Sequence, residues 1–238
     1  MRQLRRSLFR YHVWLGWLVG IPLLLWTVSG LVMVARPIET VRGSDLKLER
    51  SPAPLTPDAV QTLPFLAPGG PPVREYRVTV RESRNVAQVK YANEDQALFD
   101  TATGARLTPI GEAEARRIVG TQVRSATAKG SIAGATLFAA NAVPFDFRKP
   151  MPVWQVRLAD GTHVYVGRDT AEIEALRTPY WRFYDFMWGL HIMDLQTRED
   201  THHPILIGFT VIVALASILA ILLMIARYAP RRRKPPPG

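Results

Sequence analysis

The sequence contains no cysteine, and this absence excludes several kinds of structure and chemistry. A chain without thiols forms no disulfide bonds, so an exported domain of this size must be stabilised by its hydrophobic core. Iron–sulfur clusters held by cysteine, covalent haem attachment through CxxCH, thiol catalysis and cysteine-ligated zinc are excluded as well.

Sequence signatures of familiar catalytic sites are also missing. There is no P-loop, no GxGxxG nucleotide-binding motif and no HExxH zinc motif. Residues 130–134 read GSIAG, which lacks the spacing of the GxSxG nucleophile elbow. The sequence therefore predicts no catalytic residues and no metal site beyond a haem iron, and we do not expect the chain to be an enzyme on its own.

Charged residues are absent from two long apolar segments, residues 13–35 and residues 205–226. A bilayer core about 30 Å thick is spanned by roughly 20 apolar helical residues, so both segments are long enough to be transmembrane helices. A cleaved signal peptide is the alternative for the first segment. Its length and the poor cleavage site at residues 33–37 favour an uncleaved anchor.

Almost all of the formal net charge of +10 lies at the two ends of the chain. Residues 1–12 carry four arginines, residues 227–238 carry five basic residues, and neither end has an acidic residue. Short basic segments beside a span stay in the cytoplasm, so both termini are predicted inside and the central part outside. The excess indicates anionic lipid as a neighbour, and no nucleic-acid partner is expected.

Alternating apolar and polar residues predict short strands in the central part of the chain. The expected strands are residues 73–80, 86–92, 96–100, 131–140, 153–160 and 162–169, with a hairpin turn at Asp160 and Gly161. Helical spacing predicts one helix at residues 111–123, and Thr56 followed by Pro57 predicts the start of another. One helix, three strands and a closing turn thus occur twice, which predicts an internal repeat.

Six aromatic residues between Tyr180 and Trp188 give residues 180–203 the composition of a segment lying in the headgroup layer. The predicted fold class is membrane α plus α+β, with two transmembrane helices flanking a domain of two helix-plus-antiparallel-sheet units. The predicted parts are a basic tail (1–12), a transmembrane helix (13–35), an exported domain (36–179, units at about 52–107 and 108–179), the aromatic segment (180–203), a second transmembrane helix (204–226) and a basic tail (227–238).

The chain resembles the PepSY-associated transmembrane family of bacterial inner-membrane proteins. The residues that carry the resemblance are HVWLGWLVGIPLLLWTVSGLVMV (12–34), the repeated strand–DxxT turns and LHIMDLQTREDTHHPILI (190–207). The resemblance implies PepSY-like units in the periplasm, anchored to the inner membrane. Some relatives resemble iron-regulated siderophore reductases that carry haem between histidines. This chain departs from them by having two spans rather than about four.

Four of the five histidines lie at the predicted membrane edges. His12, Gly16 and Gly20 share one helix face, and the GxxxG spacing lets a second helix or a flat macrocycle approach. His12 is therefore either a haem ligand or a polar residue in a helix-packing face. Ala216 and Ala220 form a second face of small residues, suited to packing between the spans.

His191, His202 and His203 lie together on the opposite side of the membrane from His12. Neutral imidazole is the usual axial ligand of b-type haem, and His191 with His202 or His203 could supply two rings. The alternative is that these are interfacial polar residues bonded to lipid phosphate or to nearby acids. His12 would have to meet its own copy in a homodimer, and His163 is expected to face solvent on a strand.

Two functions follow from these observations. The first is an accessory or haem-linked electron-transfer component of periplasmic iron or siderophore reduction or uptake, with a membrane reductase or a second copy as partner. The alternative is a non-catalytic module, tethered to the membrane, that binds a periplasmic peptide or protein or regulates a peptidase. The bilayer is a partner in both cases, and b-type haem is the candidate cofactor of the first.

Overall fold

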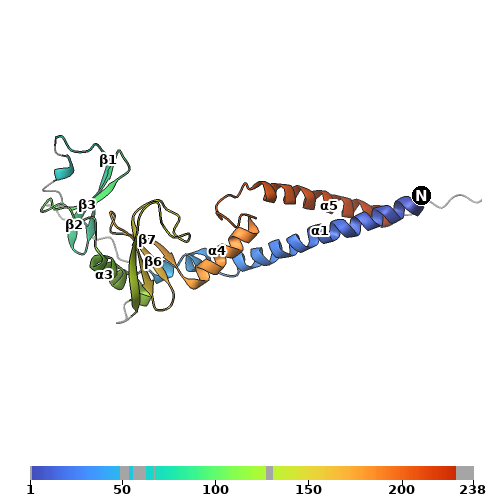
Figure 1. Ribbon diagram of the computed structural model, residues 1–238, viewed down its shortest axis with the longest axis horizontal. Helices are drawn as coiled ribbons and strands as arrows, with labels where there is room; N and C mark the ends of the chain where they lie inside the picture. The colour runs from blue at the N-terminus through green and yellow to red at the C-terminus, as the bar shows by residue number, and fades with distance from the viewer. Residues whose placement is uncertain (1, 49–53, 56–62, 67, 127–130, 229–238) are drawn as a thin grey trace, which may run out of the picture. The chain divides into compact units, whose positions relative to one another are not determined.

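The long apolar segments form two helices, α1 (Arg2–Val34) and α5 (Pro204–Tyr228), which Figure 1 shows in blue and red. The structure is a computed structural model that describes residues 2–48, 54–55, 63–66, 68–126 and 131–228. The chain divides into two compact units, residues 1–36 with 183–238 and residues 37–182.

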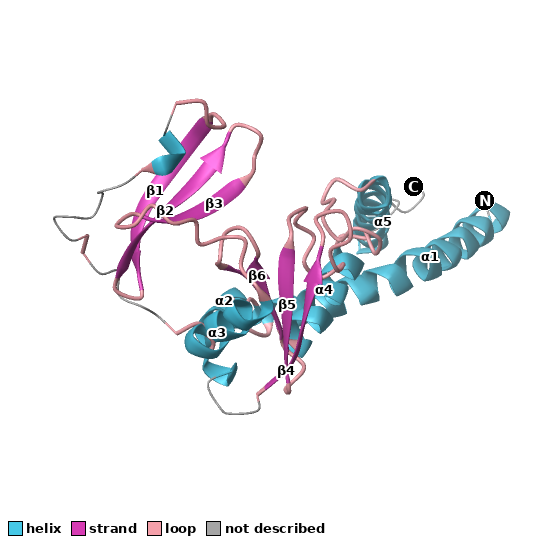
Figure 2. Ribbon diagram, turned by 60° about the vertical axis from the view of Figure 1, so that its left-hand side comes forward, coloured by secondary structure: helices cyan, strands magenta, loops and turns pink. Residues whose placement is uncertain are grey.

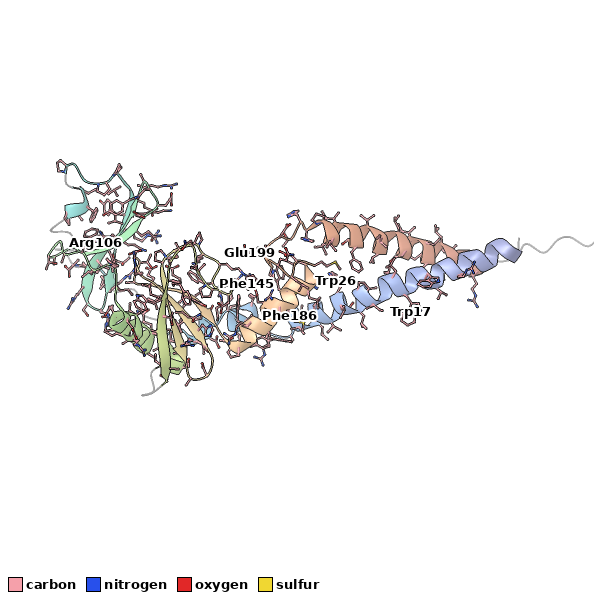
Figure 3. All side chains as sticks on the ribbon, viewed as in Figure 1. Trp17, Trp26, Arg106, Phe145, Phe186 and Glu199 are labelled. Atoms are coloured by element: carbon pink, nitrogen blue, oxygen red, sulfur yellow. The ribbon has the colours of Figure 1, made fainter. Side chains whose placement is uncertain are left out.

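Both helices of the first unit have the properties of membrane spans. The stretches Gly16–Val34 and Pro204–Leu222 are long and apolar enough to cross a bilayer, and they coincide with the predicted spans. Large apolar side chains project outward from α1, among them Trp17, which is 67% exposed and points away from α5 in Figure 3. Such a continuous apolar surface is suited to hydrocarbon rather than water, which indicates a membrane protein.

The aromatic segment predicted at residues 180–203 is helical only in its first half, as α4 (Pro179–His191). The helix ends there because the chain turns back at Met193, which has a φ of 57°. The Asp194 N–H then donates to the Gly189 carbonyl at 2.9 Å, and the Met193 N–H donates to the Leu190 carbonyl at 3.3 Å. These two bonds form the Schellman arrangement that closes many helices.

In the second unit, β1 (Val73–Arg81), β2 (Arg84–Tyr91) and β3 (Gln96–Asp100) form an antiparallel sheet in that order (Figure 2). Glu82 and Ser83 join β1 to β2 with φ values of 50° and 66°, the backbone of a two-residue type I′ turn. The core on this sheet consists of alternating strand residues together with one residue from the preceding segment: Phe65, Ala87, Val89, Tyr91, Ala97 and Phe99. The three strands predicted here are confirmed.

A second antiparallel sheet contains β4 (Ile132–Phe138), β5 (Val153–Leu158), β6 (His163–Gly167) and β7 (Ile173–Arg177) in that order. The predicted hairpin turn joins β5 to β6. Gly161 supplies the left-handed backbone with a φ of 81°, and the Asp160 carboxylate accepts the Thr162 N–H at 2.8 Å.

The fourth strand corrects the prediction of three strands and a closing turn. Residues 168–176 read RDTAEIEAL, and glutamate and alanine are poor strand formers. The end of this segment nevertheless pairs with β6, from His163 opposite Arg177 to Val166 opposite Ile173. The neighbouring strand and the burial of Leu176 therefore outweigh the local propensity.

One helix and one loop cover the two faces of the second sheet. The predicted helix is confirmed as α3 (Glu112–Gln122), which buries Ile118 and Val119 against the sheet. Its acidic first turn is favourable at the positive end of the helix dipole. On the opposite face the loop of residues 139–152 places Phe147 against Tyr165, with ring centroids 4.7 Å apart.

The remaining described elements are short turns: α2 (Ile38–Val41), η1 (Ser44–Leu46), η2 (Pro64–Leu66) and η3 (Arg124–Ala126). The helix predicted to begin at Thr56 and Pro57 lies outside the described residues. The two sheets are present, but the counterpart of β7 after β3 is only an isolated pairing of Phe99 with Arg106. The repeat and its PepSY identity therefore stay predictions.

Two leucines of the second sheet give a matched test of this core. Leu176 on β7 is 2% exposed, whereas Leu137 on β4 is 43% exposed. Leu176→Ala should lower the free energy of unfolding by roughly 2–5 kcal/mol because it leaves a cavity. Leu137→Ala should cost less than about 1 kcal/mol. Urea unfolding of the full chain in detergent, followed by tryptophan fluorescence, measures both; equal losses would contradict the packing described.

Candidate functional site

His191, the last residue of α4, lies against the C-terminal part of α1. Its imidazole stacks on the ring of Trp26, with centroids 4.6 Å apart and planes 17° apart. Trp26 and Gly30 lie one turn apart on the same face of α1. A Cβ at Gly30 would lie only 3.1 Å from His191 Cε1, so the glycine leaves room for the ring. We call Trp26, Ser29 and Gly30 the imidazole seat; Figure 3 labels Trp26.

The hydrogen bonds of the imidazole seat assign the proton on His191. Nδ1 lies 3.1 Å from both Ser29 Oγ and the Trp26 carbonyl oxygen. The Ser29 hydroxyl donates its only proton to that same carbonyl at 2.8 Å, so both neighbours of Nδ1 act as acceptors. In the neutral ring, Nδ1 therefore carries the proton and Nε2 carries the lone pair, the tautomer that metal-ligating histidines use when Nδ1–H bonds a carbonyl.

The loop after α4 is attached to that helix by Arg198. Its Nη1 donates to the buried carboxylate of Asp185 at 2.8 Å, and its carbonyl accepts the Trp188 indole N–H at 3.0 Å. Gly189 permits this contact, because a Cβ there would lie 2.7 Å from Arg198 Cγ. A buried ion pair of this kind fixes geometry, since removal of one partner leaves the other charge uncompensated. His191 thus extends from a helix end that is held in place.

Asp194 organises the same loop, in which Figure 3 labels Glu199. Its Oδ1 accepts the N–H groups of Gln196 and Thr197 at 3.2 and 3.0 Å, and its Oδ2 accepts those of Glu199 and Asp200 at 3.2 Å each. The Thr197 hydroxyl also donates to Oδ2. Hydrogen bonds from the Thr197 side chain and then from the backbone hold the pKa of Asp194 well below its usual range. The carboxylate therefore acts as a loop cap.

The other predicted haem ligands are less well defined than His191. His202 is exposed and His203 is half-buried, just before α5. Among the described residues, neither ring makes a hydrogen bond or ring contact with His191. The backbone of His12 is part of α1, but its side chain lies outside what the structure describes. A pair of axial imidazoles therefore stays a prediction.

The predicted faces of small residues are open in the described part of the chain. Gly16 and Gly20 are exposed, and no atom would lie within 4 Å of a Cβ at either position. Ala216 is half-buried and Ala220 is exposed. Helix packing through these faces is untested and stays a prediction.

A polar cluster in the second unit was missed by the sequence analysis. His163 was expected to face solvent, but its ring is half-buried, with Nδ1 3.2 Å from Asp146 Oδ2. The buried Tyr165 donates its hydroxyl to Asp146 Oδ1 and accepts from Gln155 Nε2 at 2.6 Å. Burial, and then the bond to Asp146, raise the pKa of Tyr165. The period-two spacing of His163 and Tyr165 places both on one face of a strand. Their partner Asp146 comes from a distant loop, which no sequence spacing indicates.

The second unit also contains a cavity of approximately 1270 Å³. It opens between the β1–β2 turn, α3 and the β6–β7 turn. Apolar side chains form its floor: Val86, Leu98, Ile110 and Ile118, all buried, with the more exposed Leu107 beside them. A large concave site of this composition is a general feature of ligand-binding proteins.

Ion pairs surround the mouth of the cavity. Arg117 donates to both carboxylate oxygens of Glu82 at 2.8 Å and to Glu114 at 2.6 Å. Arg81 pairs with Glu172. These pairs join the turn of the first sheet to α3 and to the second sheet. The pairs of Arg117 with Glu82 and of Arg81 with Glu172 join residues far apart in sequence, so no sequence pattern could have identified them.

Comparison of the chain with profiles of known protein families, with curated protein sequences and with solved structures gives no match. The structure by itself defines a class: a candidate membrane protein with an α+β unit inserted in sequence between two apolar helices. Its candidate sites are the imidazole of His191 and the cavity. Among the described residues, no group of three or more His, Asp or Glu side chains is arranged as a metal site.

The Asp194 cap gives a pH-dependent prediction. Its pKa is lower in the folded chain than the value near 3.9 of an unfolded chain. The stabilisation from its charge is therefore complete above about pH 5 and is lost as the pH falls through the folded pKa. Asp194→Asn should lower the Tm of the chain in detergent at pH 7, and the difference from wild type should shrink below about pH 4.

The exposed Asp45 provides the control for this experiment. Asp45→Asn removes the same charge without removing a loop cap, so its Tm should follow that of wild type at every pH. A difference between Asp194→Asn and wild type that grows on acidification would contradict the assigned role.

Proposed function

We propose that the chain is a two-pass protein of the bacterial inner membrane, with both termini in the cytoplasm and residues 37–182 in the periplasm. Its function on this proposal is that of a haem-linked accessory component of periplasmic iron or siderophore reduction or uptake. Support comes from the two apolar helices, from their basic flanks and from the resemblance to the PepSY-associated transmembrane family.

The observation that carries the haem-linked proposal is the seated imidazole of His191. Its Nδ1–H is bonded to the Trp26 carbonyl and Ser29 Oγ, so the lone pair on Nε2 is directed away from the protein bonds. Nε2 would hold the iron of a b-type haem. His202 or His203, from the same chain or from a second copy, would supply a further imidazole. Haem, when bound, supplies a one-electron carrier.

The role of the protein residues is to hold that ligand. Trp26 limits rotation of the ring by stacking, and Ser29 with the carbonyl fixes its tautomer. Gly30 leaves the space that the ring occupies. Since the sequence has no nucleotide-binding motif, the proposal requires a separate membrane reductase as the electron donor.

Absorption spectroscopy tests the haem-linked proposal. The full chain purified in detergent from haem-replete cells should show a Soret band that shifts on reduction. His191→Ala should abolish the band, whereas His163→Ala, in the other unit, should keep it.

Ser29→Ala removes one bond that orients the ring and should weaken haem binding by roughly tenfold or more. Gly30→Leu should also weaken it, whereas Gly208→Leu, which has open space around it, should not. A colourless wild-type protein would refute the proposal.

The absence of cysteine makes a clean topology experiment available. Arg157→Cys places a single thiol on β5, and Gly238→Cys places one at the C-terminus. A membrane-impermeant maleimide should label Arg157→Cys in spheroplasts, because the second unit is proposed to be periplasmic. It should label Gly238→Cys only after lysis. Labelling of Gly238→Cys in intact spheroplasts would contradict the two-pass topology.

A second candidate function is a membrane-tethered module that binds a periplasmic peptide or protein. The cavity of approximately 1270 Å³ in the second unit supports it, because a cavity of this size has no part in holding an imidazole in the first unit. The two functions use different residues, so each is testable without the other.

A further inference from the structure

We infer that the cavity between the β1–β2 turn, α3 and the β6–β7 turn binds an extended peptide segment that carries apolar side chains and a carboxylate. This inference rests on the second candidate function and names its ligand class. It follows from the charge, the floor and the size of the cavity.

The charged side chains around the cavity favour an anionic group. All three lining carboxylates are engaged by arginine: Glu82 and Glu114 by Arg117, and Glu172 by Arg81. Two further cations line the same cavity, Lys47 and Arg84, and both are exposed. The lining therefore carries a surplus of positive charge.

Among the described residues, neither Lys47 nor Arg84 forms an ion pair with a carboxylate. Lys47 Nζ donates to the Ile173 carbonyl at 3.3 Å, which is an uncharged acceptor. The acid near Arg84 is Asp100, whose Oδ1 already accepts the N–H groups of Ala102 and Thr103 at 2.9 and 3.1 Å. A ligand carboxylate can form charge-assisted hydrogen bonds with both cations.

The floor and the volume favour a ligand with several apolar side chains. The floor combines the buried Val86 and Leu98 of the first sheet with the buried Ile118 of α3, and the more exposed Leu107 lies beside them. Apolar side chains placed against it would lose contact with water, which is favourable by roughly 25 cal/mol per Å². The volume of approximately 1270 Å³ exceeds the usual range of about 300–1,000 Å³ for drug-sized ligands.

A peptide suits this lining better than a fatty acid. Ion pairs line the cavity beside its apolar floor, so an aliphatic chain that filled it would cover the guanidinium of Arg117 and the carboxylate of Glu82 without replacing their bonds to water. A peptide backbone has an N–H and a C=O at each residue, which can pair with such groups while its side chains reach the floor.

Binding of a defined probe tests the inference. The probe is a fluorescently labelled peptide of sequence LELVEL, acetylated at its N-terminus and amidated at its C-terminus, added to the full chain in detergent and followed by fluorescence anisotropy. We expect saturable binding of LELVEL. The neutral analogue LQLVQL should bind at least about tenfold more weakly. Lys47→Gln with Arg84→Gln should weaken binding of LELVEL by about tenfold or more, because charge-assisted bonds are lost.

Two further variants separate the cavity from the general surface. Leu107→Trp adds a large side chain at the edge of the floor and should weaken binding although no charge changes. Arg77→Gln with Arg157→Gln removes two exposed charges that do not line the cavity and should leave binding unchanged. Absence of LELVEL binding overturns the inference, and so does equal weakening by both double variants. Binding of laurate in place of the peptide overturns the ligand class.

The failure of this inference is distinguishable from the failure of the candidate function. A photocrosslinker placed at Ser83, in the turn beside the cavity, tests for any periplasmic partner in intact cells. Crosslinks to a partner without LELVEL binding would remove the ligand class and keep the binding function. If neither crosslinks nor LELVEL binding is observed, both the ligand class and the binding function are refuted. The haem spectrum would be unaffected in either case.

Discussion

The two helices of the first unit are long and apolar enough to cross a bilayer, where hydrocarbon offers no water to polar groups. A helix that crosses a bilayer must satisfy its own backbone groups, and any polar side chain on it needs a partner within the protein. Ser29 meets this requirement by donating to the carbonyl of Trp26 one turn earlier, and it is fully buried although most of α1 is exposed. The same carbonyl accepts from His191. The Trp26 carbonyl therefore orients the imidazole on α4 and fixes its tautomer.

The second unit is stabilised in a different way. Its two antiparallel sheets have cores of ordinary apolar side chains, and polar clusters attach loops and turns to them. Asp146 fastens the loop of residues 139–152 to β6 through His163 and Tyr165. Arg81 and Arg117 link the turn of the first sheet to the second sheet and to α3. The cavity lies among these links, so its charged rim is also part of what holds the two sheets together.

The sequence predicted the elements whose signal is carried by many residues. Two uncharged apolar segments predicted the long helices α1 and α5, and period-two alternation predicted β1, β2 and β3 to within two residues. β7 was missed because a five-residue strand with a glutamate and an alanine carries little signal, and only its neighbour β6 makes it a strand. His163 was misjudged for a related reason, since the burial of a strand residue depends on what covers that face.

The sequence alone determined the parts of this protein that depend on local composition: apolar length, basic ends, strand period, turn residues and the absence of thiol chemistry. It also placed His191 among four candidate haem ligands, together with His12, His202 and His203. Only the tertiary structure decided which nitrogen of the His191 ring carries the proton, that Asp194 is a loop cap, and that a cavity lined by four cations and three carboxylates lies between the sheets. The reason is physical: hydrogen bonds, burial and charge pairing act between atoms within a few ångströms, and the partners involved, such as Ser29 and His191, are 162 residues apart in the chain.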